Sequence, residues 1–192
     1  MASLTKKDYE NNNGMLTSVW GPSLWHSIHT ISFNYPVKPT KKEQDQYYKF
    51  IMSLEHVLPC RYCRENFPKN MKELNKKKRT TLKKALAKGR SGFSKYMYDF
   101  HNQVNIMLGK PCTLSYKDVK DRYENFRARC TLKKTKAEME EQKRRIRKEK
   151  GCTESLYGLK SKCVIVTLPA DEEHKCDSFM MDNRCKLKRG KH

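Results

Sequence analysis

Apolar side chains recur at helical spacing between residues 20 and 126, and prolines or glycines close the segments that carry them. Apolar residues three and four positions apart form one face of a helix, and a proline just past the pattern favours its end. The stretch 20–35 shows this pattern and is followed by Pro36. It predicts a first helix, with Pro22 tolerated in the first turn.

A second and a third helix are predicted on either side of Pro59. Thr40 and Glu43 form a capping-box pattern that opens the second helix, and Pro59 closes it. Because proline is also favoured at the start of a helix, we expect the third helix to begin at Cys60. We expect it to be short, because Pro68 follows within three turns.

The segment 93–108 follows a lysine-rich connector and has the clearest amphipathic pattern of the chain. Gly109 closes it, and a shorter helical pattern follows at 119–126. Helices of this length with short connections pack as a bundle. The sequence therefore predicts an all-α fold, a bundle of four helices with a short fifth helix over about residues 15–130.

Length and composition limit what surrounds this bundle. The chain has 192 residues, of which 36% are hydrophobic, and 42 Lys+Arg against 21 Asp+Glu give a formal charge of +21. This allows one domain with an appendage. We expect a polar tail over 1–14, the domain over 15–130, a charged helical linker over 131–150 and a cysteine-containing tail over 151–192. Because the sequence lacks both a run of about 18 apolar residues and a signal-like apolar segment, we expect neither a membrane span nor secretion.

Basic residues are concentrated in two segments. Residues 69–90 hold ten lysines and arginines against one acid, Glu73, and residues 133–150 continue the excess. Such a density of positive charge attracts phosphate groups. However, the acidic block 138–141 precedes the second basic cluster at helical spacing, and a self-paired, solvated helix accounts for that segment as well. Contact with nucleic acid therefore stays an alternative to a solvated basic face.

Cys60 and Cys63 form the one compact Cys-x-x-Cys pair of the sequence. At a helix start a thiolate lies near unpaired backbone amides and the positive end of the helix dipole, and Arg61 and Arg64 add positive charge to the same turn. These conditions favour a dithiol that exchanges with other thiols. Half of a zinc site and a structural pair without chemistry are the alternatives. Zinc would need two more ligands, and the remaining cysteines contain no second close pair.

Polar residues at helical spacing flank the predicted core. Trp25 and His29 are four residues apart on the first helix, and His101 and Asn105 are four apart on the fourth, with Asn102 beside them. Singly, each is explained by a structural hydrogen bond. Together they indicate that something flat and polar is bound between the helices.

Four sequence blocks carry a family resemblance. They are Trp20-Gly21-Pro22-x-x-Trp25-x-x-x-His29-Thr30, Tyr35-Pro36, Leu58-Pro59-Cys60-x-x-Cys63 and His101-Asn102-x-Val104-Asn105-x-x-Leu108-Gly109-Lys110-Pro111. In order and spacing they resemble the Erv/ALR flavin-linked sulfhydryl oxidases, across about residues 15–130. The Trp-Gly-Pro opening and the basic chain are most similar to members from large cytoplasmic DNA viruses. The resemblance implies a four-helix bundle with a short fifth helix that cradles FAD and is usually dimeric.

The same resemblance implies roles for individual residues. Cys60 and Cys63 would be the catalytic pair. The cofactor-binding residues would be Gly21, Trp25, His29, Tyr35, His101, Asn102, Asn105, Lys110 and Tyr123. Tyr123 stands where many members have an adenine-packing tryptophan, and the sequence lacks the cysteine that many members carry before the His-Asn block. Cys112 and Cys130 bracket the last helical element, and we expect them to form a structural disulfide in its place.

The implied activity is FAD-dependent thiol oxidation that forms disulfides in proteins. A substrate thiolate attacks Cys60, Cys63 passes two electrons to the flavin, and O₂ reoxidises it with release of hydrogen peroxide. The implied partners are thiol-containing proteins, O₂ and a second copy of the chain. For a viral member we expect the cytoplasm of the host, or the virion, as the location. The alternative function is a basic, zinc-stabilised nucleic-acid-binding protein.

Four further cysteines lie beyond the predicted bundle, at Cys152, Cys163, Cys176 and Cys185. Many family members carry a close cysteine pair outside the bundle that relays electrons, but these spacings are wider. We expect two structural bridges in a small module built around the β-like run 164–168. A zinc site formed by the same cysteines with His174 is the alternative. The charged helix at 133–150 would hold this module away from the bundle.

Overall fold

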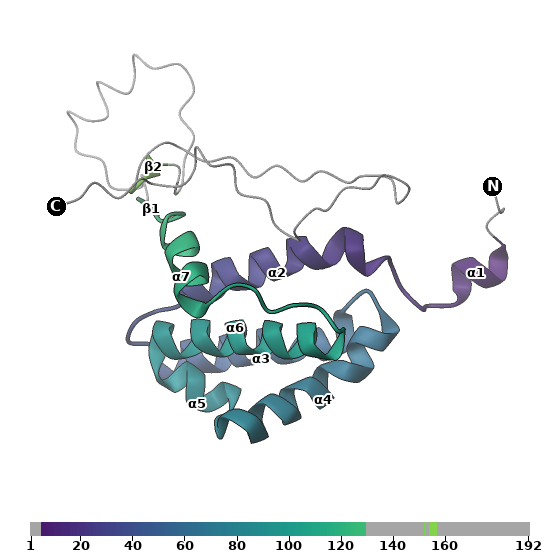
Figure 1. Ribbon diagram of the computed structural model, residues 1–192, viewed down its shortest axis with the longest axis horizontal. Coiled ribbons are helices and arrows are strands. Elements are labelled where there is room, and N and C mark those ends of the chain that lie inside the picture. The colour runs from purple at the N-terminus through teal and green to yellow at the C-terminus, as the bar shows by residue number, and fades with distance from the viewer. Residues whose placement is uncertain (1–4, 130–151, 153, 157–192) are drawn as a thin grey trace, which may run out of the picture. The chain divides into compact units, whose positions relative to one another are not determined.

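The computed structural model describes residues 5–129, 152 and 154–156. The chain divides into two compact units, residues 1–116 and 117–192. The first unit contains the helices α1 (Lys6–Glu10), α2 (Thr17–Asn34), α3 (Lys41–Val57), α4 (Arg61–Lys78), α5 (Leu82–Ala87) and α6 (Gly89–Met107). Helix α7 (Tyr116–Glu124) begins at the boundary between the units. Figure 1 shows these elements in chain order.

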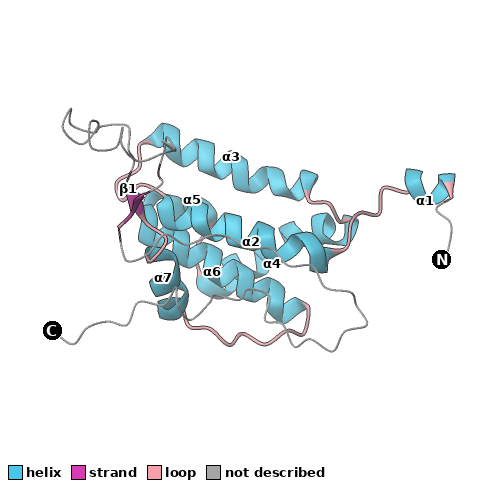
Figure 2. Cartoon of the chain, turned by 90° about the horizontal axis from the view of Figure 1, so that it is seen from above, coloured by secondary structure: helices cyan, strands magenta, loops and turns pink. Residues whose placement is uncertain are grey.

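The four long helices α2, α3, α4 and α6 form the bundle, which confirms the predicted all-α architecture. Helix α6 packs against α2, α4 and α5, while α3 packs against α4 and α5. Figure 2 shows the long helices lying side by side. Among the described residues, no helix is long and apolar enough to cross a membrane.

Aromatic and aliphatic side chains from all four long helices and from α5 fill the core. Tyr35, Ile51, Phe93 and Met97 are fully buried. Ring contacts bind the elements together: Tyr35 meets Phe93 edge to face, with ring centroids 5.1 Å apart. Burying such side chains contributes roughly 1.5–3 kcal/mol each. The core cluster runs from Ile28 to Phe100, within the first unit.

Two helix ends follow the predicted chemistry. The Thr40 hydroxyl accepts the Glu43 amide and the Glu43 carboxylate accepts the Thr40 amide, so the capping box at α3 is confirmed. At the end of α6, Gly109 takes a positive φ of 66° and the Lys110 amide donates to the Asn105 carbonyl at 2.8 Å. This closes α6 where the glycine predicts it.

Other boundaries differ from the prediction. Helix α2 begins at Thr17, so Pro22 lies in its interior and not in its first turn. The third helix is not short: α4 continues through Pro68 to Lys78. The lysine-rich connector contains α5, and the N-terminal tail contains α1, which has a Thr5–Asp8 capping box and no buried residue. Proline removes one backbone hydrogen bond, and here the helix on both sides of Pro68 is held by packing against α3 and α6.

Gly89 joins α5 to α6 at a close backbone approach. Its φ is +74°, and an added Cβ would lie 2.1 Å from the Val37 carbonyl oxygen. Beside it, the Arg90 Nε donates to the Tyr35 carbonyl at 2.6 Å. The loop after α2 is thereby fastened to the start of α6.

The second unit is described only in its first part and at residues 152 and 154–156. Within it, Tyr123 of α7 packs edge to face with Phe126. The strand β1 (Ala128–Arg129) pairs antiparallel with β2 (Glu154–Ser155). The expected charged helix at 133–150, the β-like run at 164–168 and the pairing of the tail cysteines lie outside the described residues and stay predictions. So do the expected domain boundaries.

Candidate active site

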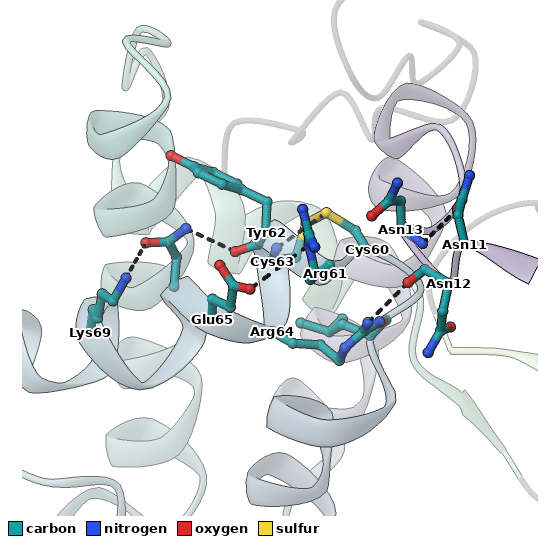
Figure 3. A network of polar contacts seen from close by, with 12 residues as sticks. Asn11, Asn12, Asn13, Cys60, Arg61, Tyr62, Cys63, Arg64, Glu65 and Lys69 are labelled. Carbon is teal, nitrogen blue, oxygen red and sulfur yellow. Dashed lines mark hydrogen bonds and ion pairs between the residues drawn. A yellow bond between two sulfur atoms is a disulfide. The ribbon is translucent and has the colours of Figure 1, made fainter. Parts of the chain in front are cut away.

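Cys60 and Cys63 are joined in a disulfide at the start of α4, with their Cα atoms 5.2 Å apart (Figure 3). Cys60 is the N-cap of the helix, and its Sγ accepts the backbone N–H of Cys63 at 3.1 Å. The prediction that this pair begins a helix is therefore confirmed. Both residues are half-buried, so the disulfide is partly open to solvent.

The surroundings of Cys60 favour a thiolate when the disulfide is reduced. The Cys63 amide is one of the N–H groups that a helix start leaves without a partner in the helix, and it points at the sulfur. Arg64 lies in the same turn, where its guanidinium donates to the Leu58 carbonyl at 2.6 Å. Arg61 is exposed and forms an ion pair with Glu65 at 3.9 Å. A reacting thiolate at Cys60 is thus stabilised by a hydrogen bond and by nearby positive charge.

A segment from the N-terminal side lies along Cys60, a contact that the sequence does not predict. We call residues 12–15 the strap. The Met15 amide donates to the Pro59 carbonyl at 2.7 Å, and the Arg61 amide donates to the Asn13 carbonyl at 2.9 Å. Gly14 and Cys60 therefore form an antiparallel bridge. The Asn-Gly sequence in the strap signals a turn, but nothing local in it specifies a partner distant in the chain.

A second cluster lies between α2 and α6. The Nε2 atom of His29 and the Nδ1 atom of His101 are 3.0 Å apart, so one imidazole donates a hydrogen bond to the other. The ring of Trp25 stacks on that of His101, with centroids 4.0 Å apart and planes 6° apart. The structure thus brings together three of the predicted cofactor-binding residues, from two helices.

Both histidines of this cluster are neutral near pH 7. Burial, followed by the neighbouring charges of His101 and His26, lowers the pKa of His29 to about 3. Burial, followed by the charge of Lys110, lowers the pKa of His101 to about 4. A neutral imidazole has one donor and one acceptor nitrogen, so the pair is suited to hydrogen bonding. The effect of Lys110 on His101 also places a positive charge near the cluster.

The remaining residues selected for this cluster are distributed more widely. Asn105 lies one turn after His101 on α6, and its carbonyl accepts the Lys110 amide. Gly21 lies on α2, and apart from the adjoining residues of its own helix no atom is within 4 Å of the position that a Cβ would take there. Asn102 lines a hollow of about 350 Å³ between α4 and α6, whose lining does not include His101. The structure therefore places Asn102 on another side of α6 from the histidine pair.

Tyr35 and Tyr123 lie in other surroundings. Tyr35 is buried in the core against Tyr47 and Phe93, and its hydroxyl finds no hydrogen-bond partner among the described residues. Burial, followed by the charge of Glu43, raises the pKa of Tyr35 to about 12. Tyr123 is buried within the second unit. Cofactor contacts by these two residues stay predictions.

Cys112 has a free, exposed thiol, and its Sγ donates to the Asn102 carbonyl at 3.8 Å. The structure therefore does not form the expected Cys112–Cys130 disulfide. Cys130 itself lies outside the described residues, and the pairing stays a prediction. For zinc, no group of three His, Cys, Asp or Glu side chains suited to a metal ion occurs in the part of the chain that the structure describes.

Comparison with known proteins places this architecture in a family. The Erv1 / Alr family matches residues 22–124, which include the disulfide, the histidine pair and all four long helices except the first turn of α2. The chain belongs to the Erv1 / Alr family.

Two viral relatives share about a third of their aligned residues with this Erv1 / Alr chain. A protein of Invertebrate iridescent virus 6 assigned as an FAD-linked sulfhydryl oxidase, 347L, is 32% identical over 93 residues, which are 48% of this chain and 82% of the relative. One of Acanthamoeba polyphaga mimivirus, R368, with the same assignment, is 33% identical over 91 residues, which are 47% of this chain and 59% of the relative.

A solved structure also aligns with the Erv1 / Alr chain. The crystal structure of the FAD binding domain of Erv1 from Saccharomyces cerevisiae covers 57% of this chain and 94% of its own length. The identity is 25% and the TM-score is 0.48. The family assignment rests on the sequence matches.

Proposed function

We propose that this chain is an FAD-linked sulfhydryl oxidase that forms disulfides in thiol-containing proteins and uses O₂ as the electron acceptor. The observation that carries the proposal is the Cys60–Cys63 disulfide at the N-terminus of α4, in a chain of the Erv1 / Alr family. The relatives from two viruses and from yeast have names that describe FAD-linked sulfhydryl oxidases.

The chemistry of the cluster between α2 and α6 fits a flavin nucleotide. Trp25 and His101 offer flat rings, and His29 offers a buried imidazole that is neutral at pH 7. Lys110 supplies positive charge next to this cluster, as a phosphate requires. The open position at Gly21 leaves space on α2 that a side chain would fill. We propose that these residues, with Asn105, hold the cofactor.

The chain's own part in the reaction is thiol–disulfide exchange at Cys60 and Cys63. A substrate thiolate attacks Sγ of Cys60, the bond between Cys60 and Cys63 breaks, and Cys63 leaves as a thiolate. A second substrate thiolate then attacks the substrate sulfur of the mixed disulfide. Cys60 leaves as a thiolate, which the Cys63 amide and Arg64 stabilise. The products are a substrate disulfide and a reduced Cys60/Cys63 pair that holds two electrons.

When bound, FAD supplies the two-electron chemistry that returns this pair to the disulfide and reduces O₂, with two protons, to hydrogen peroxide. We assign Cys60 as the sulfur that meets the substrate and Cys63 as the sulfur that faces the cofactor. This assignment is supported by the position of Cys60 at the helix cap, beside the exposed Arg61.

We further propose a homodimer as the assembled state and the cytoplasm of an infected host cell, or the virion, as the location. The resemblance to viral members supports the location, as do the iridovirus and mimivirus relatives. The nucleic-acid alternative gains no support from the relatives. It also loses two of its zinc ligands whenever Cys60 and Cys63 are joined in a disulfide.

A visible absorption spectrum and an elemental analysis of the purified full-length chain test the proposal. We expect a yellow protein with an absorption band near ~450 nm, one FAD per chain and hydrogen peroxide formed with each disulfide during dithiothreitol oxidation. A colourless protein that contains one zinc per chain and does not oxidise dithiothreitol after addition of FAD would contradict it.

A further inference from the structure

Exposed apolar side chains occur on the segments next to the Cys60 disulfide, namely the strap, the end of α3 and the first turn of α4. We call Met15, Leu16, Val57 and Tyr62 the apolar rim, and their exposed fractions are 70%, 74%, 65% and 56%. Met15 ends the strap and Leu16 follows it, Val57 ends α3 just before Pro59, and Tyr62 lies in the first turn of α4. Exposed apolar side chains on several segments that adjoin a reactive sulfur are typical of a binding surface.

The strap side of the rim is held firmly. The Met15 amide is bound to Pro59, and the Met15 carbonyl accepts the Trp20 indole N–H at 3.0 Å. Arg64 adds a second donor, with its guanidinium 3.4 Å from the Asn12 carbonyl. Figure 3 shows the asparagines of the strap on one side of Cys60 and Tyr62 on the other.

Gly14 lets the strap lie against Cys60. Its φ is +122°, and an added Cβ would lie 2.5 Å from the Pro59 carbonyl oxygen and 2.6 Å from the Cys60 Cα. The two hydrogen bonds of the bridge come from the neighbours of Gly14, so its own N–H and C=O point away from Cys60. Neither group has a hydrogen-bond partner among the described residues, and together they form a short open strand edge.

We propose that the apolar rim and this edge dock an extended, apolar segment of the protein substrate, next to the cysteine that attacks Cys60. The inference rests on the proposed function, because a sulfhydryl oxidase needs the cysteine sulfur of its protein substrate to reach Cys60. An extended peptide adds to an open edge by backbone hydrogen bonds and takes its specificity from side-chain contacts. The exposed Arg61 at the same place favours acidic residues in the docked segment.

The size of the rim favours a transient partner over a second copy of this chain. A stable interface buries about 800 Å² per partner and involves about 20–30 residues on each side. Four side chains and one glycine edge fall far below this. A substrate that must leave after each turnover needs only such a small surface.

The test compares two substrates on the full-length, FAD-loaded protein. One is a reduced peptide with two cysteines flanked by leucines, and the other is dithiothreitol. Leu16→Glu changes the rim without removing a helix cap, because the Leu16 side chain makes no capping hydrogen bond. We expect it to lower the ratio of kcat/KM for the peptide to kcat/KM for dithiothreitol at least fivefold. Gly14→Ala should lower the same ratio, because it displaces the strap.

Val37→Glu is the matched control, since Val37 is 65% exposed and lies in the loop after α2, beside Gly89. It should leave the ratio within twofold of wild type. A ratio unchanged by Leu16→Glu, or changed equally by Val37→Glu, would overturn the docking proposal. So would a dimer that Leu16→Glu converts to a monomer in sedimentation, since the rim would then join two copies. A wild-type protein that oxidises neither substrate contradicts the proposed function itself.

Discussion

His29 and His101 lie at the centre of the cluster between α2 and α6, and both imidazoles are neutral near pH 7. Each lies at a helical position where burial makes the charged imidazole costly, so both titrate far below their usual range. The 3.0 Å contact between them satisfies one nitrogen on each ring, and Trp25 covers the face of His101. The sequence spacing brought these residues to helix flanks, but only the packing of α2 against α6 shows that they meet.

Replacing His101 by alanine should weaken both the fold and cofactor retention. The change removes the hydrogen-bond partner of a buried nitrogen on His29 and the ring on which Trp25 stacks. A buried polar group that loses its partner costs about 1–3 kcal/mol. We expect a lower Tm and less FAD per chain after gel filtration. His56→Ala is the control, because His56 is exposed on α3, and it should change neither quantity. Unchanged FAD content in His101→Ala would remove His101 from the cofactor site.

The same pair should make the protein less stable in mild acid. The pKa of His29 falls to about 3 and that of His101 to about 4 in the folded chain, from a usual 6.5. Well above pH 6.5 both rings are neutral in either state, and the pair adds no pH dependence. Between pH 6.5 and about 4 only the unfolded chain binds these protons, so the free energy of unfolding falls as the pH falls, by up to about 1.4 kcal/mol per pH unit for each histidine.

Urea unfolding at pH 7 and pH 5 measures this effect. We expect the wild-type midpoint to fall more between these pH values than that of His101→Ala, in which one of the two titrating groups is gone. Equal falls in the two proteins would show that carboxylates, and not the histidine pair, set the acid sensitivity.

At the scale of elements, the sequence predicted helix boundaries best where a local signal acts. The capping box at Thr40 and the glycine after α6 act within a few residues, so the sequence alone placed them. The strap is different. Its hydrogen bonds to Pro59 and Arg61 join segments far apart in the chain, and no local pattern specifies such a pairing. The position of the Cys60/Cys63 pair at a helix start was predicted from the sequence, whereas the strap beside it is seen only in the structure.

Helix α4 also differs from the sequence prediction, at Pro68 in its interior. Pro68 predicted an end, because proline removes a hydrogen bond and clashes with the preceding turn. Yet α4 continues, since Phe67, Met71 and Leu74 bury one face on both sides of the proline. Helix α5 was missed for a related reason: Leu82, Ala85 and Leu86 are buried, but they are separated by lysines that dominate the composition of the segment.

Pro68→Ala should therefore stabilise the protein. The alanine restores a backbone donor toward the Arg64 carbonyl in an exposed helix interior, where proline is about 3 kcal/mol less favourable. We expect the free energy of urea unfolding to rise by about 1–3 kcal/mol. Lys69→Ala, at the next exposed position, should stay within about 0.5 kcal/mol of wild type. A loss of stability in Pro68→Ala would mean that the proline shapes α4 in a way that packing requires.

At the scale of the whole molecule, the described functional residues and the core gather in one part of the chain. The core cluster, the disulfide and the histidine pair lie in the first unit, and the family matches residues 22–124. The family's domain can therefore account for cofactor binding and for exchange at Cys60. The four tail cysteines lie beyond the residues that match the family, whereas the basic segment 69–90 lies within them.

A chain shortened after Cys130 tests this division. We expect it to retain FAD and to oxidise dithiothreitol at a rate within about threefold of the full-length chain, because nothing in the core cluster is removed. We expect the truncation to lower, at most, the activity on a protein substrate. If the shortened chain binds FAD but no longer oxidises dithiothreitol, the tail cysteines relay electrons and the division is wrong.

In the proposed reaction, Cys60 and Cys63 together carry electrons from thiols to the cofactor. Oxygen consumption by the FAD-loaded protein with dithiothreitol tests it most directly, in wild type, Cys60→Ser and Cys63→Ser. Wild type should consume one O₂ for each disulfide formed, and each variant should retain less than about 1% of that rate while keeping its bound FAD, because thiol–disulfide exchange needs both sulfurs. Either variant working at the wild-type rate would contradict the account.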